Sequence, residues 1–589
     1  MRIRKLLNIS ASVLLAIVLL SLTWSILESS AQANEIKVSP ASVSDSNVAL
    51  PAASGVQTDV VRITIIHLND VYEISPVRGG AMGGLARIAT LKQQLLAQNP
   101  NTFITFSGDM YSPAALSTAI YYSDMGGDNE PFDGIQVVKV MNTIGLDYMT
   151  FGDHEFNTLY GEPFSVATNH FFRNLNQSEF SIVSSNVFST NGQSFSTPNT
   201  TVKVNDTFTV SNESGVSATI GIFGVTENIR GDMVGISQTN IISASEIQVA
   251  SLTNEGADVI IALTHQRLEH DQSMSQQFSD TIDLILGADD HDPKRSDLTS
   301  TPPIYKSSSS LENVYVVDLY YDTATNSVVG ITPTLMAITS TITENAETKA
   351  VADEWLQRGF DAFVREGISP TEVIVQTPVD LDGFAGTIRY TSTTLTRLIG
   401  DGFTNAAISN ITATTPYSGH LAFYASGNLR LDDNLPAESN VIWYDIMRTF
   451  PTTDSLSTVE ISGNVLTALL GSPTANEGTG SYILQSSNVT YSGGWLIDGK
   501  PIDSNGTYWI STTKGIADAL IQFFGATLVK EHTIDTQQAT ANELKRQYSS
   551  PTAVHFSDLG ARPSPWLWLS AILMLTAAGL IAWRWRLLR

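Results

Sequence analysis

The segment "LDYMTFGDHEFN", residues 146–157, decides how the first part of the chain is interpreted. Its apolar start is typical of a short buried strand, and Gly152 marks the turn that ends the strand. Asp153, His154 and Glu155 follow directly. A histidine between two carboxylates is either catalytic or part of an ordinary polar turn. The choice therefore depends on whether other segments supply partners.

The same arrangement recurs along the first half of the chain, where apolar strands alternate with helical patterns. This alternation predicts an α/β layered fold. Polar side chains follow the apolar runs of "VRITIIHLND" (61–70), "TFITFSGD" (102–109), "IALTHQ" (261–266) and "LGADDHD" (286–292). In layered α/β folds such strand ends line one crevice. A single "GD" or "THQ" is more often a turn, but the ordered set of Asp and His suits a two-metal site.

Length, charge and cysteine content limit the classes of protein. The chain has 589 residues, which is too long for one core and predicts two folded domains. Its formal net charge of -26 argues against nucleic acid as a partner, because no basic surface is evident to hold phosphates. The absence of cysteine excludes disulfides and cysteine-zinc sites.

Both ends of the chain resemble membrane-targeting segments. Basic residues, an apolar run and "AQA" predict a secretory signal peptide over 1–33, with an uncleaved anchor as the alternative. Near the other end, 566–583 is apolar, with tryptophans at its edges, and predicts a transmembrane anchor. The arginines in 584–589 place that tail in the cytoplasm. We therefore expect a single-pass protein of the cell membrane whose ectodomain is extracellular or periplasmic.

The composition between these ends predicts the domain boundaries. Residues 34–58 are rich in Ser, Pro and Ala and indicate a linker. The first domain is expected over 59–340, an amphipathic linking helix over 341–368 and the second domain over 369–560. In the second domain, "STTLTRLIGDGFTNAA" (392–407) predicts a helix, whereas "NVIWYDIM" (440–447) and "STVEISG" (457–463) predict strands.

Several motifs occur in the order of a known family. "HLNDVYEI" (67–74), "GGLARIATL" (83–91), "SGD" (107–109), "GDHEFN" (152–157) and "LGADDHD" (286–292) resemble the secreted 5'-nucleotidase group of calcineurin-like metallophosphoesterases, which includes UDP-sugar hydrolases and 2',3'-cyclic phosphodiesterases. The resemblance runs from about Ile63 to about Phe524. It implies an N-terminal four-layer α/β/β/α metallophosphoesterase sandwich, followed by a C-terminal α/β 5'-nucleotidase-type substrate domain.

The resemblance also implies a metal centre. Asp109 would bridge two divalent ions, and the rest of the set would complete the two sites. A metal-held hydroxide would then attack phosphorus in line. The implied ligands are Asp70 and His291 for one ion and Asp153, His265 and Asp289 for the other.

The resemblance assigns the remaining catalytic and substrate-binding positions. His154 would protonate the leaving group or stabilise a phosphoryl oxygen, with Asn157 in the place of the residue that orients its ring. Asn428 and Arg430 lie in "SGNLR", where the family has "SGGIR" with a substrate-binding arginine; a structural surface arginine is the alternative. The implied partner is a small-molecule phosphate ester, a nucleotide or a related compound.

Four departures from the family fall on the site itself. Tyr72 replaces a ligand His of the family, and Asp153 replaces a ligand Asn. Asn157 replaces the Asp that orients the catalytic His, and Asp289 replaces a His. With Asp70 and Asp109, this gives four carboxylates around two dications, which moves the preference from zinc toward Mn or Mg, with iron as an alternative. Tyr72 either ligates a ferric ion or is hydrogen-bonded. With Asn157 in place of Asp, the pKa of His154 is expected to be lower.

The substrate domain departs from the family where that family stacks a ring on the base. Thr452 stands in the place of the family's Phe. Phe523 and Phe524 lie near the other aromatic position, but we expect them to form the core face of a helix. Because aromatic stacking is a main source of affinity for a base, recognition of a nucleobase is weakened.

Two functions remain open at this level. The first is a membrane-anchored, metal-dependent phosphoesterase, and the second is a degenerate family member that binds a ligand at the surface without turnover. Tyr72, Asn157 and Asp289 discriminate between them, because an enzyme requires all three to be working replacements. The ordered strand-end ligands favour the enzyme.

Overall fold

The computed structural model describes residues 59–548, except for 160–163, 228, 230–234, 298–300, 410 and 412–416. The described residues belong to one compact unit, Thr58–Arg589. The predicted signal peptide (1–33), linker (34–58), membrane anchor (566–583) and tail (584–589) lie outside them. Within the described ranges, no helix is both long and apolar enough to cross a membrane.

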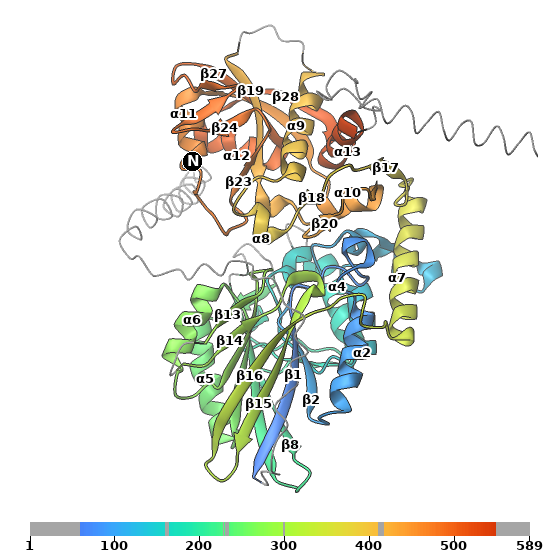
Figure 1. Cartoon of the computed structure of the whole chain (residues 1–589), viewed down its shortest axis with the longest axis vertical. Coiled ribbons are helices and arrows are strands. Elements are labelled where there is room, and N and C mark those ends of the chain that lie inside the picture. Colours follow the sequence, from blue (N-terminus) through green and yellow to red (C-terminus); the bar gives the residue numbers. More distant parts are fainter. Residues whose placement is uncertain are drawn as a thin grey trace, which may run out of the picture. The chain divides into compact units, whose positions relative to one another are not determined.

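The first domain contains two six-stranded sheets. The first has the order β16-β15-β1-β2-β5-β6, and Figure 1 shows β16, β15, β1 and β2 of this sheet. The second has the order β13-β14-β12-β11-β9-β8. The strands of the first sheet are β1 (Val60–Leu68), β2 (Thr102–Phe106), β5 (Tyr148–Met149), β6 (Ser181–Ile182), β15 (Asn313–Asp322) and β16 (Ser327–Ala337). Those of the second are β8 (Asn205–Ser211), β9 (Ser217–Thr226), β11 (Val259–His265), β12 (Leu284–Ala288), β13 (Lys294–Ser296) and β14 (Ile304–Lys306).

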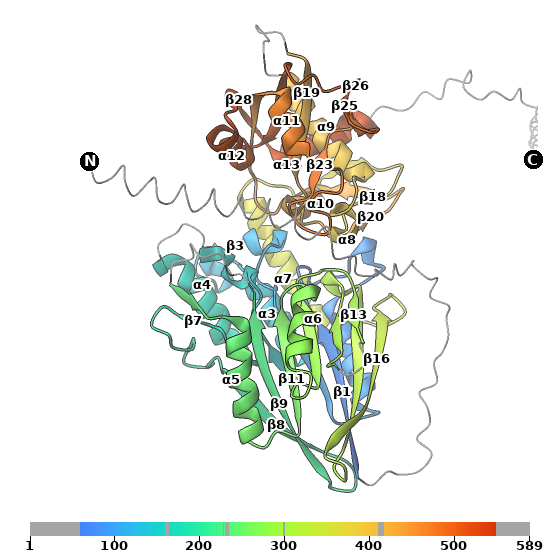
Figure 2. The ribbon, with the colours of Figure 1, turned by 90° about the vertical axis from the view of Figure 1, so that its left-hand side faces the viewer.

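The two sheets pack face to face, and helices cover their outer faces. Alternating residues such as Ile63 and Ile65 of β1 meet Ile261 and Leu263 of β11 in one buried cluster between the sheets. The helices over the first sheet are α2 (Leu85–Leu96), α3 (Ile135–Ile144), α4 (Phe164–Gln177) and α7 (Ala346–Arg365); those over the second are α5 (Ile241–Asn254) and α6 (Leu268–Gln277). Figure 2 shows α5 and α6 together with β9 and β11. The predicted four-layer α/β/β/α sandwich is therefore confirmed.

Helix α7 lies in the range 341–368 and packs on the first domain. The side chain of Asn345 caps it by accepting a hydrogen bond from the backbone N–H of Thr348. Trp355 and Phe363 are buried in the same cluster as α2 and α3. The helix is thus held by tertiary contacts along much of its length.

The second domain is a five-stranded sheet with helices on both faces. The strand order is β23-β19-β27-β22-β28. Its strands are β19 (Gly419–Ala425), β22 (Ser455–Ser462), β23 (Ile483–Gln485), β27 (Thr507–Thr513) and β28 (Thr527–Asp535). One face is covered by α9 (Thr394–Ile408), α10 (Trp443–Thr449) and α13 (Thr536–Tyr548), and the other by α11 (Gly463–Leu470) and α12 (Lys514–Phe524).

One strand prediction in this domain is wrong. Only Asn440–Ile442 of "NVIWYDIM" is a strand, β21, and the remainder forms α10. The Asp445 side chain accepts a hydrogen bond from the Ile442 backbone N–H at 2.9 Å, which caps the helix start. Such a cap favours a helix over continued strand.

Short elements complete the described chain. The 3-10 helices are η2 (Arg78–Gly80), η3 (Ala115–Thr118), η4 (Ser123–Met125), η5 (His154–Leu159), η6 (Ser309–Leu311) and η7 (Ser426–Asn428), and α8 spans Ala385–Ile388. The short strands are β3 (Ile120–Tyr121), β4 (Glu130–Pro131), β7 (Val187–Ser189), β10 (Ile236–Gln238), β17 (Val373–Gln376), β18 (Leu381–Asp382), β20 (Asn434–Leu435), β21 (Asn440–Ile442), β24 (Val489–Tyr491), β25 (Trp495–Ile497) and β26 (Lys500–Pro501).

Candidate active site

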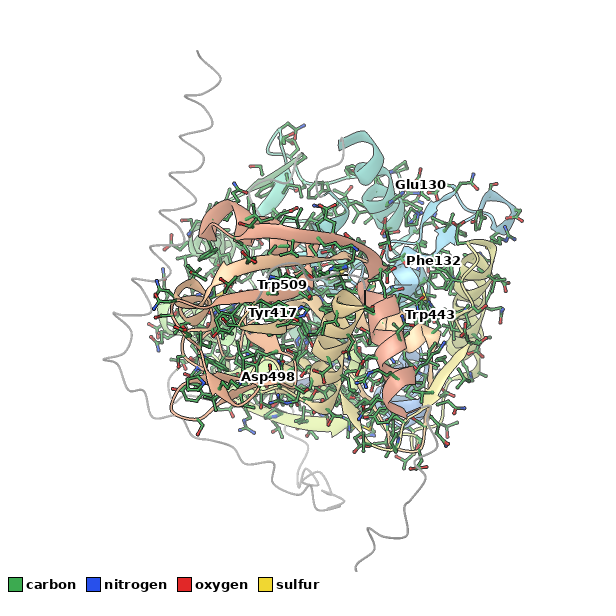
Figure 3. All side chains as sticks on the ribbon, turned by 90° about the horizontal axis from the view of Figure 1, so that it is seen from above. Glu130, Phe132, Tyr417, Trp443, Asp498 and Trp509 are labelled. Atoms are coloured by element: carbon green, nitrogen blue, oxygen red, sulfur yellow. The ribbon has the colours of Figure 1, made fainter. Side chains whose placement is uncertain are left out.

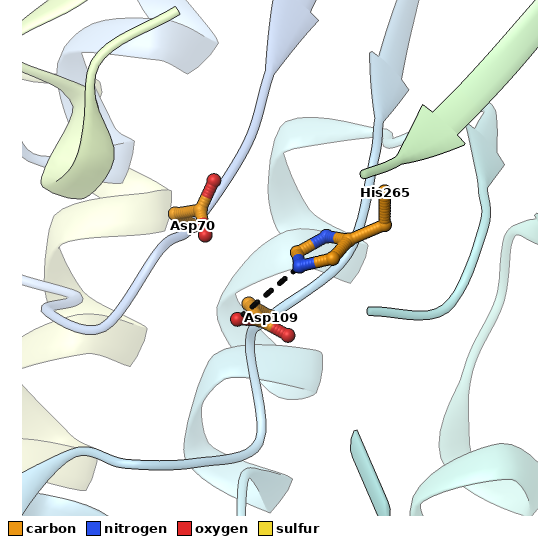
Figure 4. A group of neighbouring side chains, drawn as sticks. All are labelled: Asp70, Asp109 and His265. Atoms are coloured by element: carbon orange, nitrogen blue, oxygen red, sulfur yellow. Dashed lines mark ion pairs between the residues drawn. The ribbon is translucent and has the colours of Figure 1, made fainter. Parts of the chain in front are cut away.

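The candidate ligands come from the carboxyl ends of parallel strands in both sheets. Strands β1, β2 and β5 are parallel neighbours in the first sheet, and β11 and β12 are parallel in the second. The structure brings their ends together, as Figure 4 shows for Asp70, Asp109 and His265. In each of three groups, the ligand atoms lie within 4.8 Å of one another. The groups are Asp70, Asp109 and His265; Asp109, Asp153 and His154; and Asp153, His265 and Asp289.

The backbone at these strand ends is strained. Asp70, Asp109, Asp289 and His291 have φ values of 52°, 67°, 80° and 60°, in the left-handed region that non-glycine residues rarely adopt. Strain of this kind clusters at functional sites, where the surrounding structure enforces it. Gly152 is required for a different reason, since a Cβ there would lie 2.0 Å from Asp109 Oδ1. The backbone therefore holds the carboxylates in place.

His265 is oriented for metal binding. Its Nδ1 atom lies 2.7 Å from the Ser107 carbonyl oxygen, to which it donates, so Nε2 faces the carboxylates. Nε2 is buried and makes no hydrogen bond to any described residue. It lies 3.5 Å from Asp109 Oδ2 and 3.5 Å from Asp153 Oδ1. A buried imidazole nitrogen between two carboxylates is a set of donor atoms that suits a shared cation, so these residues fit the divalent ions that the motifs imply.

The electrostatics of the cluster lead to the same conclusion. Burial raises the pKa of Asp109 to about 8, and Asp153 adds to this. Burial lowers the pKa of His265, but the Asp109 and Asp153 carboxylates outweigh it and hold that pKa well above its usual value. The clustered carboxylates therefore favour a nearby positive charge, which a divalent cation would supply.

His291 faces the centre with one nitrogen and the second domain with the other. Its Nε2 lies 3.6 Å from Asp70 Oδ1, and its Nδ1 lies 2.7 Å from Asp432 Oδ2. Asp432 also accepts hydrogen bonds from Ser309 Oγ and, at 2.8 Å, from the Ala385 backbone N–H. Sequence reasoning missed Asp432, because it does not follow an apolar strand of the first domain.

Tyr72 is hydrogen-bonded within the site. Its hydroxyl lies 3.3 Å from Asp70 Oδ1, 3.2 Å from Asp109 Oδ2 and 3.2 Å from His291 Nε2. Burial, together with Asp109 and Asp70, raises its pKa well above the usual value for tyrosine. The geometry favours the hydrogen-bonded alternative over ferric ligation.

Glu155 joins two of the ligand-bearing loops. Its carboxylate accepts hydrogen bonds from the backbone N–H groups of Asp109 at 2.9 Å and Met110 at 2.6 Å, and also from those of Tyr111 and Gly152. It thereby ties the loop after β2 to the loop after β5. The sequence analysis gave Glu155 no role. Its position two residues after the candidate ligand Asp153 was the one feature of the sequence that could have indicated a role.

Lys306 is a second position that sequence reasoning missed. This cation is fully buried and pairs with Asp290 at 2.6 Å and Asp271 at 2.9 Å. Its ammonium also donates to the carbonyl oxygens of Gln266 and Ala288, the neighbours of His265 and Asp289. Lys306 therefore fixes the loops that carry two candidate ligands, and its charge offsets nearby carboxylates.

His154 lies at the rim of the centre. Its backbone N–H donates to Asp109 Oδ1 at 3.0 Å, and its Nε2 lies 4.0 Å from Asp109 Oδ2. Burial lowers the pKa of His154 to about 3, so the ring is neutral at pH 7. Asn157 falls in η5, but its side chain lies outside the described part of the chain.

A cavity of about 730 Å³ connects the centre to the second domain. Asp153 and His154 line one side, and Asn428, Arg430 and Thr452 line the other. The Arg430 guanidinium makes no hydrogen bond or ion pair to a described residue, which leaves it available to an anion.

The expectation for two phenylalanines is wrong. Phe523 and Phe524 are 48% and 42% exposed at the end of α12, so they do not form its core face. The buried side chains of α12 are Ala517 and Leu520 instead. Neither phenylalanine lines the cavity beside His154.

A second cavity, of about 290 Å³, is lined by Asp289, Lys294 and Arg389. Lys294 is paired with Asp292 at 2.7 Å. Arg389 makes no side-chain hydrogen bond or ion pair within the described residues. The sequence analysis did not select it, because one arginine in a polar segment carries no signal by itself.

Comparison with known proteins gives the family. A calcineurin-like phosphoesterase profile matches residues 63–293, and a 5'-nucleotidase C-terminal domain profile matches residues 373–526. The two profiles occupy the two domains described above. The chain belongs to the 5'-nucleotidase family of calcineurin-like metallophosphoesterases, which are hydrolases.

Individual relatives are distant. The trifunctional nucleotide phosphoesterase protein YfkN of Bacillus subtilis (strain 168) is 29% identical over 249 residues, covering 40% of this chain and 16% of that protein. The 5'-nucleotidase of Mus musculus is 22% identical over 452 residues, covering 71% of each chain. The crystal structure of a 5'-nucleotidase precursor from Thermus thermophilus aligns with a TM-score of 0.61 at 16% identity, covering 83% of this chain and 97% of that one. This last likeness establishes the fold alone.

Proposed function

We propose that the chain is a metal-dependent phosphomonoesterase that hydrolyses small phosphate esters. One observation carries this proposal: the buried Nε2 of His265, which makes no hydrogen bond within the described residues and lies 3.5 Å from the carboxylates of Asp109 and Asp153. It is supported by the relatives, several of which are named as 5'-nucleotidases. A nucleotide or a related compound is the corresponding substrate class.

The proposed ligands are the six residues expected from the sequence. Asp109 belongs to two of the three groups, as Asp153 and His265 also do, and in keeping with the family resemblance it would be shared by both ions. When bound, divalent ions supply Lewis-acid activation of water and of the phosphoryl oxygens. Mn or Mg suits the oxygen-rich set better than zinc, with iron as the alternative. The other ligands would be Asp70, Asp153, His265, Asp289 and His291.

The remaining side chains would hold the substrate. The neutral ring of His154 is suited to donate an N–H to a phosphoryl oxygen, because its low pKa leaves no proton to transfer at pH 7. Arg430, which lines the cavity beside His154, would place positive charge on the phosphate, and Arg389 lines the second cavity beside Asp289. Asn428 would contact the leaving group from the second domain. The role assigned to Asn157, to orient His154, stays a proposal.

We also propose that the enzyme works outside the cytoplasm, anchored through 566–583. The apolar segments at 1–33 and 566–583 support this. The proposed domains are 59–340 and 369–560, joined by 341–368.

The alternative, a surface binding protein without turnover, is less well supported. A protein that only binds has no need for a buried imidazole held between two carboxylates. The strained backbone at Asp70, Asp109, Asp289 and His291 also implies a site that retains its geometry.

Hydrolysis of p-nitrophenyl phosphate tests the proposal. We expect the purified chain to lose activity after chelation and to regain it with Mn or Mg more than with Zn. Failure of every metal, including iron, to restore turnover would favour the binding protein.

A further inference from the structure

The cavity beside His154 has a lining unlike that needed to hold a nucleobase. A base is held chiefly by stacking on exposed aromatic faces. Apart from the imidazole of His154, Phe450 is the one aromatic side chain among the described residues that line this cavity, and it is only 3% exposed. The stacked pair Tyr417 and Trp509 of the second domain, labelled in Figure 3, is not part of the lining.

Hydroxyl groups line the cavity instead. Of these, Ser112, Thr452, Thr453 and Thr513 make no side-chain hydrogen bond to a described residue. Thr513 is 2% exposed and lines the cavity, so a ligand there could reach its hydroxyl. A ligand with its own hydroxyls would satisfy such groups, because each hydroxyl both donates and accepts.

Two carboxylates also line the cavity, Asp133 from the first domain and Asp454 from the second. Asp133 Oδ2 contacts His170 Nδ1 at 2.5 Å, and Asp454 Oδ2 accepts a 3.4 Å hydrogen bond from the Gly515 backbone N–H. The Oδ1 atom of each has no hydrogen-bond partner among the described residues. Carboxylates accept hydrogen bonds from hydroxyls and repel a second phosphate. They therefore favour a monoester with an uncharged, hydroxyl-rich leaving group.

From these contacts we propose that the preferred substrates are monophosphates of sugars or polyols, with the hydroxyl-rich part held by Asp133, Asp454 and the free hydroxyls. This inference rests on the proposed phosphomonoesterase function. The volume of about 730 Å³ is ample for a hexose phosphate. Arg430 and His154 at the metal end would hold the phosphate.

The test compares specificity constants for glucose 6-phosphate, 5'-AMP, phosphocholine and p-nitrophenyl phosphate with saturating metal. We expect kcat/KM for glucose 6-phosphate to exceed that for 5'-AMP at least tenfold. A preference for 5'-AMP would overturn the inference. A preference for phosphocholine would also overturn it, because the carboxylates would then select a cation and not a hydroxyl-rich group. Activity toward p-nitrophenyl phosphate distinguishes failure of the substrate preference from failure of the phosphomonoesterase proposal. If this activity is absent, the proposed function itself is refuted.

Variants test the residues directly. Asp454→Asn and Asp133→Asn should each lower the ratio of kcat/KM for glucose 6-phosphate to that for p-nitrophenyl phosphate about tenfold. The surface variant Asp498→Asn, at a position labelled in Figure 3, should leave the ratio unchanged. Equal losses on both substrates would contradict a role in leaving-group recognition.

A gain-of-function variant completes the test. Thr452→Phe places an aromatic face in the cavity wall and should raise kcat/KM for 5'-AMP relative to glucose 6-phosphate at least fivefold. Binding of both ligands to the metal-free parent chain, prepared with a chelator and measured by calorimetry, gives a readout independent of turnover. Tighter binding of 5'-AMP than of glucose 6-phosphate to that chain would also contradict the inference.

Discussion

His291 Nδ1 lies 2.7 Å from Asp432 Oδ2, so a candidate metal ligand of the first domain is oriented by a carboxylate of the second. Burial alone would raise the pKa of Asp432, but contact with His291 lowers it to about 2, so the carboxylate stays ionised. This bond fixes which nitrogen of His291 faces the centre. It makes the metal site dependent on the second domain.

Replacing Asp432 should therefore weaken metal binding. Loss of a carboxylate that orients a ligand His typically costs 10–100-fold in affinity. We expect a loss in this range for Asp432→Ala, measured by calorimetric titration of the metal-free chain with Mn. The exposed Asp518→Ala should have no effect. An unchanged affinity in Asp432→Ala would mean that His291 is not a ligand.

Glu155 should be required for the conformation of the two ligand loops. In Glu155→Gln, the amide keeps one acceptor oxygen, so some of the four backbone N–H groups lose their partner. Each buried donor left without a partner costs about 1–3 kcal/mol. We expect a loss of about 2–4 kcal/mol in the free energy of unfolding, measured by urea denaturation.

The matched control for this variant is Glu347→Gln, an exposed glutamate in the first turn of α7. Its expected change is below about 0.5 kcal/mol. Similar values for the two variants would show that Glu155 does not hold the loops.

Lys306 should contribute far more to stability than an exposed lysine. Removing one partner of a buried ion pair typically costs about 3–5 kcal/mol, because the remaining charges are left uncompensated. Lys306→Met should therefore strongly lower the free energy of unfolding and also reduce metal content. Asp271 and Asp290 would then be the uncompensated carboxylates.

Lys349→Met serves as the comparison, since the pair of Lys349 and Asp353 is exposed. Such pairs contribute about 0.3–0.5 kcal/mol. If the two methionine variants lost equal stability, the buried network would have no structural role.

Asp283 gives a pH dependence away from the metal centre. Burial raises its pKa to about 6, although its side chain accepts a 2.8 Å hydrogen bond from the Ile260 backbone N–H. Because the folded pKa exceeds the unfolded one, its stabilising contribution is present below about pH 4 and is lost as the pH rises through 6.

Asp283→Asn retains an acceptor and cannot ionise. We expect it to be more stable than the parent at pH 8 by about 1–3 kcal/mol and nearly equal at pH 4, by urea denaturation at both values. Asp498→Asn should show no such difference between the two pH values. Equal stability of Asp283→Asn and the parent at pH 8 would refute the assignment.

The sequence predicted the ligands better than the residues that support them. Asp70, Asp109 and His265 each follow an apolar strand, so parallel strand ends bring them together. Glu155 acts through backbone contacts, and Asp432 and Lys306 act across long sequence separations. No local pattern reports such contacts.

Two local predictions failed for identifiable reasons. "NVIWYDIM" is apolar enough for a strand, but Asp445 caps a helix within it. Phe523 and Phe524 were assigned to a core face on hydrophobicity alone, whereas both are exposed at the end of α12. Exposed aromatic residues of this kind follow from tertiary packing and not from local sequence.

The most direct test of the central claim measures metal content and p-nitrophenyl phosphate hydrolysis in the parent chain and in Asp109→Asn. We predict about two divalent ions per parent chain by elemental analysis, with metal-dependent turnover. Asp109→Asn should lose turnover and most of the bound metal, because it removes the carboxylate shared by both ions. Full metal content and unchanged turnover in Asp109→Asn would contradict the account.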